Sequence, residues 1–201
     1  SNFAGSAIAG GIERIVRRRA EQAREVFLDQ LGHGTRPPRD PGEIDEFIAI
    51  TYRYMSKAQE GAARLNLRLM ARVVRSMLEG EGLYASEFLR HSEMLASLSR
   101  EEVILLATRY RLRKSLEKSR QTAQWQDTSI VNTHVEKELV PRVFSTPLHL
   151  TASMTALQRT GLVWPAATSV GGGVIWQDTP LLDQIAALAR FEDALEADTK
   201  G

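Results

Sequence analysis

Apolar and small residues recur at coiled-coil spacing from residue 40 to residue 79. Up to Leu69 the steps between them alternate four and three, which keeps these side chains on one side of a helix. The pattern predicts one continuous helix spanning on the order of 60 Å. We expect it to pack on an earlier helix over residues 6–31 as an antiparallel hairpin, on a second copy of the chain, or on both. The members of this seam are Ile44, Ile48, Thr51, Met55, Ala58, Ala62, Leu65, Leu69, Val73 and Met77.

The same stretch begins with a clear helix start. Asp40 is a favourable N-cap, Pro41 suits the first helical position, and Glu43 follows three residues after the cap. Gly80 and Gly82 are typical of a helix end. Residues 1–82 are therefore predicted to be a long helical hairpin that serves as an association region, and residues 83–201 a second domain.

Basic residues form a row on this predicted helix: Arg53, Lys57, Arg64, Arg68, Arg72 and Arg75. The earlier helix offers Glu21, Glu25 and Asp29 at four-residue spacing. Opposite charges flanking a helical seam set partner and register, so we interpret the row as a contact surface for another helix. A surface for nucleic-acid phosphates or anionic lipid is the alternative. The predicted interaction residues are Met55, Ala58, Ala62, Leu65, Leu69, Arg64, Arg68, Arg72 and Arg75.

Composition excludes several classes of site. The 201-residue chain has no cysteine and a net charge of +1. Disulfides, zinc-thiolate sites and thiol nucleophiles are therefore absent, and attraction to nucleic acid or membrane would need a local patch. No apolar run approaches the roughly 20 residues of a membrane span. The absence of cysteine fits a reducing cytoplasm, so a cytoplasmic protein is expected. The chain begins Ser1-Asn2 without methionine, which is typical of a cleavage remnant and leaves an upstream targeting segment open.

The second half predicts a compact helical domain with a small β-hairpin. Helices are expected over residues 86–98, 100–119, 129–139 and 147–160, the second of them behind a capping box at Ser99 and Glu102. Two short β-prone runs at residues 162–164 and 174–176 flank a glycine-rich loop and predict a hairpin. Thr179-Pro180 predicts the start of a last helix.

The order helix, Gly161-Leu162-Val163, hairpin, Thr179-Pro180, helix resembles the closing part of a winged-helix domain. The blocks at residues 86–89, 95–104, 157–163 and 176–182 are also similar to the Abi-alpha family, which is associated with phage abortive infection. That resemblance implies a role in defence or stress and carries over no catalytic residues.

A winged helix that read duplex DNA would place residues 147–160 in the major groove. This segment has one arginine, Arg159, and residues 165–173 have no Lys or Arg. Such a set is poor for phosphate and guanine contacts, which favours protein contact instead.

No catalytic, cofactor or metal site is predicted. His134 and Glu138 have helical i, i+4 spacing, but a lone pair of this kind is typical of a surface contact. Residues 171–173 precede a strand, so the glycines lack the geometry of a phosphate loop.

The sequence thus predicts a non-enzymatic interaction or regulatory protein. We expect it to form a homo-oligomer, most simply a dimer, and a further protein partner is compatible with this prediction. One alternative is a winged-helix DNA-binding regulator. The other is a peripheral membrane or toxin-like protein that uses the apolar and basic residues near its N-terminus, Ile8, Ile12 and Ile15 with Arg14, Arg17, Arg18 and Arg19.

Overall fold

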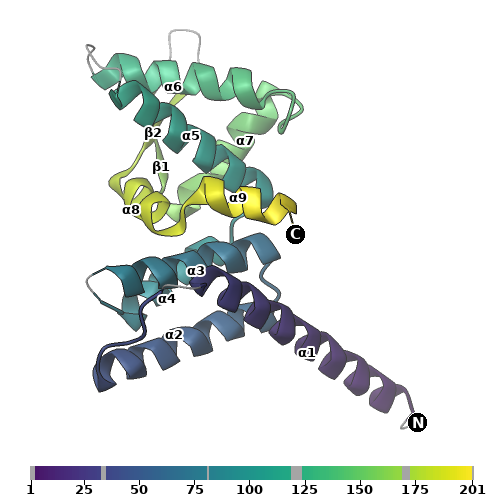
Figure 1. The fold of residues 1–201 in the computed structure, drawn as a ribbon. Helices are drawn as coiled ribbons and strands as arrows, with labels where there is room; N and C mark the ends of the chain where they lie inside the picture. Colours follow the sequence, from purple (N-terminus) through teal and green to yellow (C-terminus); the bar gives the residue numbers. More distant parts are fainter. Residues whose placement is uncertain (1–2, 33–34, 81, 119–123, 169–172, 201) are drawn as a thin grey trace. The chain divides into compact units, whose positions relative to one another are not determined.

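The computed structural model describes residues 3–32, 35–80, 82–118, 124–168 and 173–200. The chain is mainly helical with one two-stranded antiparallel sheet, as predicted (Figure 1). It divides into two compact units. Unit 1 comprises Ser1–Ser97 and Ala197–Gly201, and unit 2 comprises Leu98–Glu196. No helix in the described ranges is both long enough and apolar enough to cross a membrane.

Unit 1 is built around helix α3. Its helices are α1 (Phe3–Leu31), α2 (Pro41–Glu60), α3 (Arg64–Glu79) and α4 (Ala85–Ala96). Helix α3 contacts α1, α2 and α4. Because its neighbours approach from several directions, buried side chains occur all round α3, including Leu67, Leu69, Met70 and Val74.

The long helix predicted over residues 40–79 is wrong, because the chain breaks between α2 and α3. Gly61 adopts the left-handed conformation, with φ of 104°. Its N–H donates to the Ala58 carbonyl, and the Ala62 N–H donates to the Lys57 carbonyl. This hydrogen-bonding pattern ends a helix and turns the chain, and glycine adopts it without a side-chain clash.

The units also divide later than Gly82, the predicted domain boundary. Helix α4 contacts both α2 and α3 and therefore belongs to unit 1. Its buried Phe88 and Leu95 explain this placement, since both side chains are removed from water. The Leu95 carbonyl also accepts a hydrogen bond from Asn66 of α3 at 2.6 Å.

Unit 2 contains α5 (Arg100–Lys118), α6 (Gln124–Leu139), α7 (Pro147–Leu157), the 3-10 turn η1 (Gln158–Thr160), β1 (Val163–Thr168), β2 (Val174–Asp178), α8 (Pro180–Ala189) and the first part of α9 (Phe191–Lys200). The predicted capping box at the start of α5 is confirmed. The Glu102 N–H donates to Ser99 Oγ at 3.2 Å, and the Ser99 N–H donates to Glu102 Oε2 at 2.8 Å.

The predicted hairpin pairs β1 with β2, with Val163 opposite Asp178 and a bulge between Pro165 and Ala167. Residues 169–172, which hold most of its predicted glycine-rich loop, lie outside the described residues. Gly161 leaves the preceding turn with φ of 71°, and Thr179 Oγ1 donates to its carbonyl at 2.7 Å. The predicted last helix divides at Arg190 into α8 and α9.

Candidate functional site

An apolar groove runs between α1 and α2 in unit 1. It has a volume of about 530 Å³. Helix α1 contributes Arg17, Ala20, Glu21, Arg24, Phe27, Leu28 and Leu31, and helix α2 contributes Phe47, Thr51 and Met55. Three charged side chains lie along α1, and the other lining residues offer mainly carbon surface. A groove of this composition suits the apolar face of another helix.

Large apolar side chains beside the groove are left in contact with solvent. Leu28 is 57% exposed on α1, and Ile44, Ile48 and Tyr52 are 47%, 59% and 76% exposed on α2. Ile44, Ile48 and Tyr52 follow one another at four-residue spacing, so they share a face of α2. Clustered exposed side chains of this size mark an interaction surface. We call the groove and these four residues the α1–α2 face.

Aromatic side chains pack closely beneath this face. Phe27 packs against Tyr54 with ring centroids 4.7 Å apart and against Phe47 at 6.1 Å. The Tyr54 hydroxyl donates to the Ala23 carbonyl at 3.0 Å. Burial raises the pKa of this hydroxyl, so it stays neutral. A docked helix would therefore meet a preformed surface.

The five seam residues predicted to contact a partner lie in different surroundings. Met55 lines the groove and is partly exposed. Ala58, Leu65 and Leu69 are buried in unit 1, and Ala62 lies in the turn after Gly61. Contacts of these five residues with a partner stay a prediction, and for the three buried ones the observed neighbours belong to the same chain.

The predicted arginines lie on α3, next to acidic residues of unit 1. Arg64 and Arg68 line a cleft with Glu25 and Asp29 of α1, two members of the predicted acidic row. Arg68 is 5% exposed, and its Nε lies 3.9 Å from Asp198 Oδ1.

The other predicted arginines are Arg72, which is partly exposed, and Arg75. Arg75 pairs with Glu79 at 2.7 Å and donates to the Gln30 carbonyl at 3.4 Å. Several of these charges therefore have intrachain partners, and whether they contact another molecule stays a prediction.

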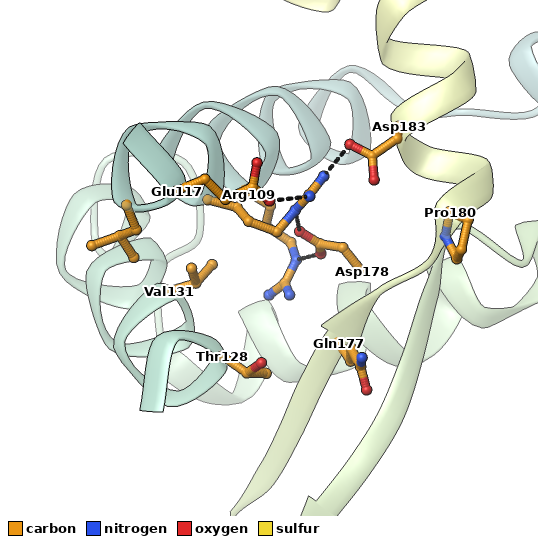
Figure 2. A pocket seen from close by; sticks show the side chains of 10 residues that line it. Arg109, Glu117, Thr128, Val131, Gln177, Asp178, Pro180 and Asp183 are labelled. Carbon is orange, nitrogen blue, oxygen red and sulfur yellow. Dashed lines mark hydrogen bonds and ion pairs between the residues drawn. The ribbon is translucent and has the colours of Figure 1, made fainter. Parts of the chain in front are cut away.

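Unit 2 holds a second, polar cavity of about 240 Å³ between α5, α6, β2 and α8 (Figure 2). Asp178 lies at its centre. Its Oδ1 accepts from Arg109 Nε at 2.6 Å, and its Oδ2 accepts from Arg113 Nε at 3.1 Å. Arg113 Nη2 also donates to Asp183 at 2.6 Å. Figure 2 shows Asp178 and Asp183 pointing toward these guanidinium groups.

Buried charges in this cavity compensate one another. Arg109 and Asp178 side chains are each 2% exposed. Arg109 Nη2 also donates to the Trp176 carbonyl at 3.0 Å. Burial opposes charge on Arg113 and Asp183, but their mutual hydrogen bond and neighbouring charges outweigh it, which raises the pKa of Arg113 and lowers the pKa of Asp183.

Both oxygens of the Asp178 carboxylate accept hydrogen bonds from arginines of the same chain. We therefore interpret this cavity as a structural junction that joins α5 to β2 and α8. Arg111 of α5 also forms intrachain ion pairs, with Glu138 of α6 and Glu192 of α9. The basic side chains of α5 between residues 109 and 114 are thus engaged in intrachain ion pairs.

The sequence did not identify the α1–α2 face. Leu28, Phe47 and Tyr52 fall outside the predicted seam, and the seam pattern places Ile44 and Ile48 on one uninterrupted helix. The available signal was Gly61, whose position inside the apolar pattern is typical of a helix end.

Within the described ranges, no group of three or more metal-ligating side chains comes together.

Comparisons of the chain with protein-family models, with curated proteins and with solved structures find no match. The functional proposal therefore rests on the geometry of the chain itself.

Proposed function

We propose that this chain is a non-enzymatic interaction protein that assembles with a second copy of itself through the α1–α2 face. The observation that carries the proposal is the apolar groove together with exposed Leu28, Ile44, Ile48 and Tyr52. Burial of such side chains is the main favourable term in protein association. Symmetric dimers are the commonest oligomers, and they require one self-complementary surface.

In this proposal unit 2 is a winged-helix-like module for protein contact. The order α7, η1, β1, β2 and α8 supports the winged-helix assignment. Arg159, the only arginine in residues 147–160, is held by Glu102 at 2.6 and 2.8 Å. A guanidinium engaged in this way is a weak candidate for guanine or phosphate contact, so protein contact is favoured over duplex DNA. The resemblance to the Abi-alpha family adds a defence or stress setting.

The solution mass tests the assembly. We expect light scattering after gel filtration to give twice the mass of one chain for the wild type. Leu28→Asp and Tyr52→Asp place a charge on the α1–α2 face and should raise the dimer Kd by about a hundredfold or more, equivalent to about 3 kcal/mol.

The matched control is Leu148→Asp on α7, where the wild-type leucine is 77% exposed and lies outside the α1–α2 face. It should leave the mass of the dimer unchanged. A wild-type protein that stays monomeric at about 100 μM would overturn the proposal, because a stable dimer of this kind has a much lower Kd.

A further inference from the structure

The groove side of α1 carries charges in an order that complements itself. Arg17, Glu21 and Arg24 follow at spacings of four and three and line the groove, with the small Ala20 between them. Arg17 pairs with Glu13 at 3.0 Å. Neither Glu21 nor Arg24 forms an ion pair with any residue that the structure describes, and both are exposed.

An antiparallel second copy satisfies both unpaired charges. If the two-fold axis crosses α1 midway between Glu21 and Arg24, Glu21 of each copy lies opposite Arg24 of the other. A two-fold axis forms every such contact twice. The same alignment places the turn at Arg17 opposite Leu28 of the second copy, whose side chain enters the groove.

A parallel arrangement fails on charge. It would place Glu21 opposite Glu21 and Arg24 opposite Arg24, and like charges facing each other across an interface are destabilising. Ala20 favours a close crossing in the antiparallel case, since its small side chain lets two helices approach.

The N-terminal part of α1 carries exposed apolar side chains. It extends beyond the other helices of unit 1 (Figure 1), and Ile12 and Ile15 on it are 57% and 54% exposed. A helical stretch without tertiary contacts has little stability in water. In the register above, α1 of the second copy overlaps residues 14–31 and ends before it reaches Ile12, so the pairing supports only the C-terminal part of this stretch.

We propose that the dimer is an antiparallel α1–α1 pair about a two-fold axis between Glu21 and Arg24, an inference that rests on the proposed function. The reciprocal Glu21–Arg24 pairs set the register, and Leu28 with the groove residues supplies the buried apolar contact. The specificity of self-association thus comes from charges, and its affinity from apolar surface.

Charge reversal tests the register. Glu21→Arg and Arg24→Glu alone each replace two attractive pairs by two repulsive ones, and each should raise the dimer Kd by about tenfold or more at about 50 mM salt. The double variant restores both pairs in inverted order, so its Kd should lie within about threefold of the wild type. Sedimentation equilibrium measures all four constants.

Glu136→Arg and Lys137→Glu on exposed positions of α6 are the matched controls and should leave the Kd unchanged. If Leu28→Asp disrupts the dimer but both single charge reversals leave its Kd unchanged, the register is overturned and the α1–α2 face is still the interface. A double variant weaker than both single variants would also overturn the register. A monomeric wild type would overturn the assembly itself.

Discussion

The α1–α2 face and the cavity of unit 2 use side chains in opposite ways. On the α1–α2 face, apolar side chains such as Ile48 and Tyr52 remain exposed to water. In unit 2, the charged Arg109 and Asp178 are almost fully buried. Each departs from the usual distribution, in which apolar groups are inside and charges outside.

The difference lies in what compensates each departure. Asp178 receives hydrogen bonds from two arginines of the same chain, so the buried charges are paired internally. The exposed apolar side chains of α1 and α2 are not covered by the described residues of unit 1, and burial against another surface would stabilise them. The internally paired charges therefore serve the architecture of unit 2, and the uncovered apolar side chains support the proposed partner of unit 1.

Asp178→Asn is expected to give the largest effect on stability. It leaves Arg109 buried opposite a neutral amide, which should lower the free energy of unfolding of unit 2 by about 3–5 kcal/mol. Urea unfolding followed by tryptophan fluorescence measures this, because all three tryptophans lie within residues 98–196.

Glu117→Gln is the control for this experiment. Glu117 pairs with Arg113 and Lys114 but is 36% exposed, so its loss should cost below about 1 kcal/mol. If Asp178→Asn also lowered the free energy of unfolding by less than about 1 kcal/mol, the cavity of unit 2 would not be a structural junction.

Leu69→Ala separates buried apolar residues from those on the α1–α2 face. Leu69 is fully buried, so the substitution should lower the free energy of unfolding of unit 1 by about 2–5 kcal/mol. Urea unfolding followed by far-UV circular dichroism should show the loss, whereas the dimer mass stays at the wild-type value. A loss of dimer mass at unchanged stability would instead make Leu69 a partner contact.

His91 provides a smaller test, because it is a buried polar side chain without compensation. It is 1% exposed, and neither ring nitrogen has a hydrogen-bond partner among the described residues. Burial lowers its pKa, with a smaller opposing effect from Glu87. Below a pH of about 6.5 the unfolded chain binds the proton and the folded chain does not, so the stability of unit 1 falls as the pH drops.

Urea unfolding between pH 7.5 and about 5.5 should reveal this slope. His91→Leu should flatten it, and His134→Leu, at an exposed position of α6, should preserve it. An unchanged slope in His91→Leu would show that another group carries the pH dependence.

Local signals in the sequence predicted many element boundaries. Asp40 Oδ1 accepts from the Glu43 N–H at 2.9 Å, as an N-cap does, and the capping box of Ser99 and Glu102 forms as predicted. These predictions succeeded because capping depends on residues three positions apart. The sequence also indicated charge compensation, since Glu25 and Asp29 line a cleft with Arg64 and Arg68.

The sequence by itself determined which side chains share a helix face, such as Ile44 with Ile48, and the mainly helical fold with its hairpin. It did not determine which face another element would cover. Tertiary packing decided that Leu65 and Leu69 lie in the core while Ile48 and Tyr52 stay exposed, since the turn at Gly61 reorients α3 relative to α2. Burial depends on contacts between residues far apart in the chain, and a local apolar pattern does not specify them.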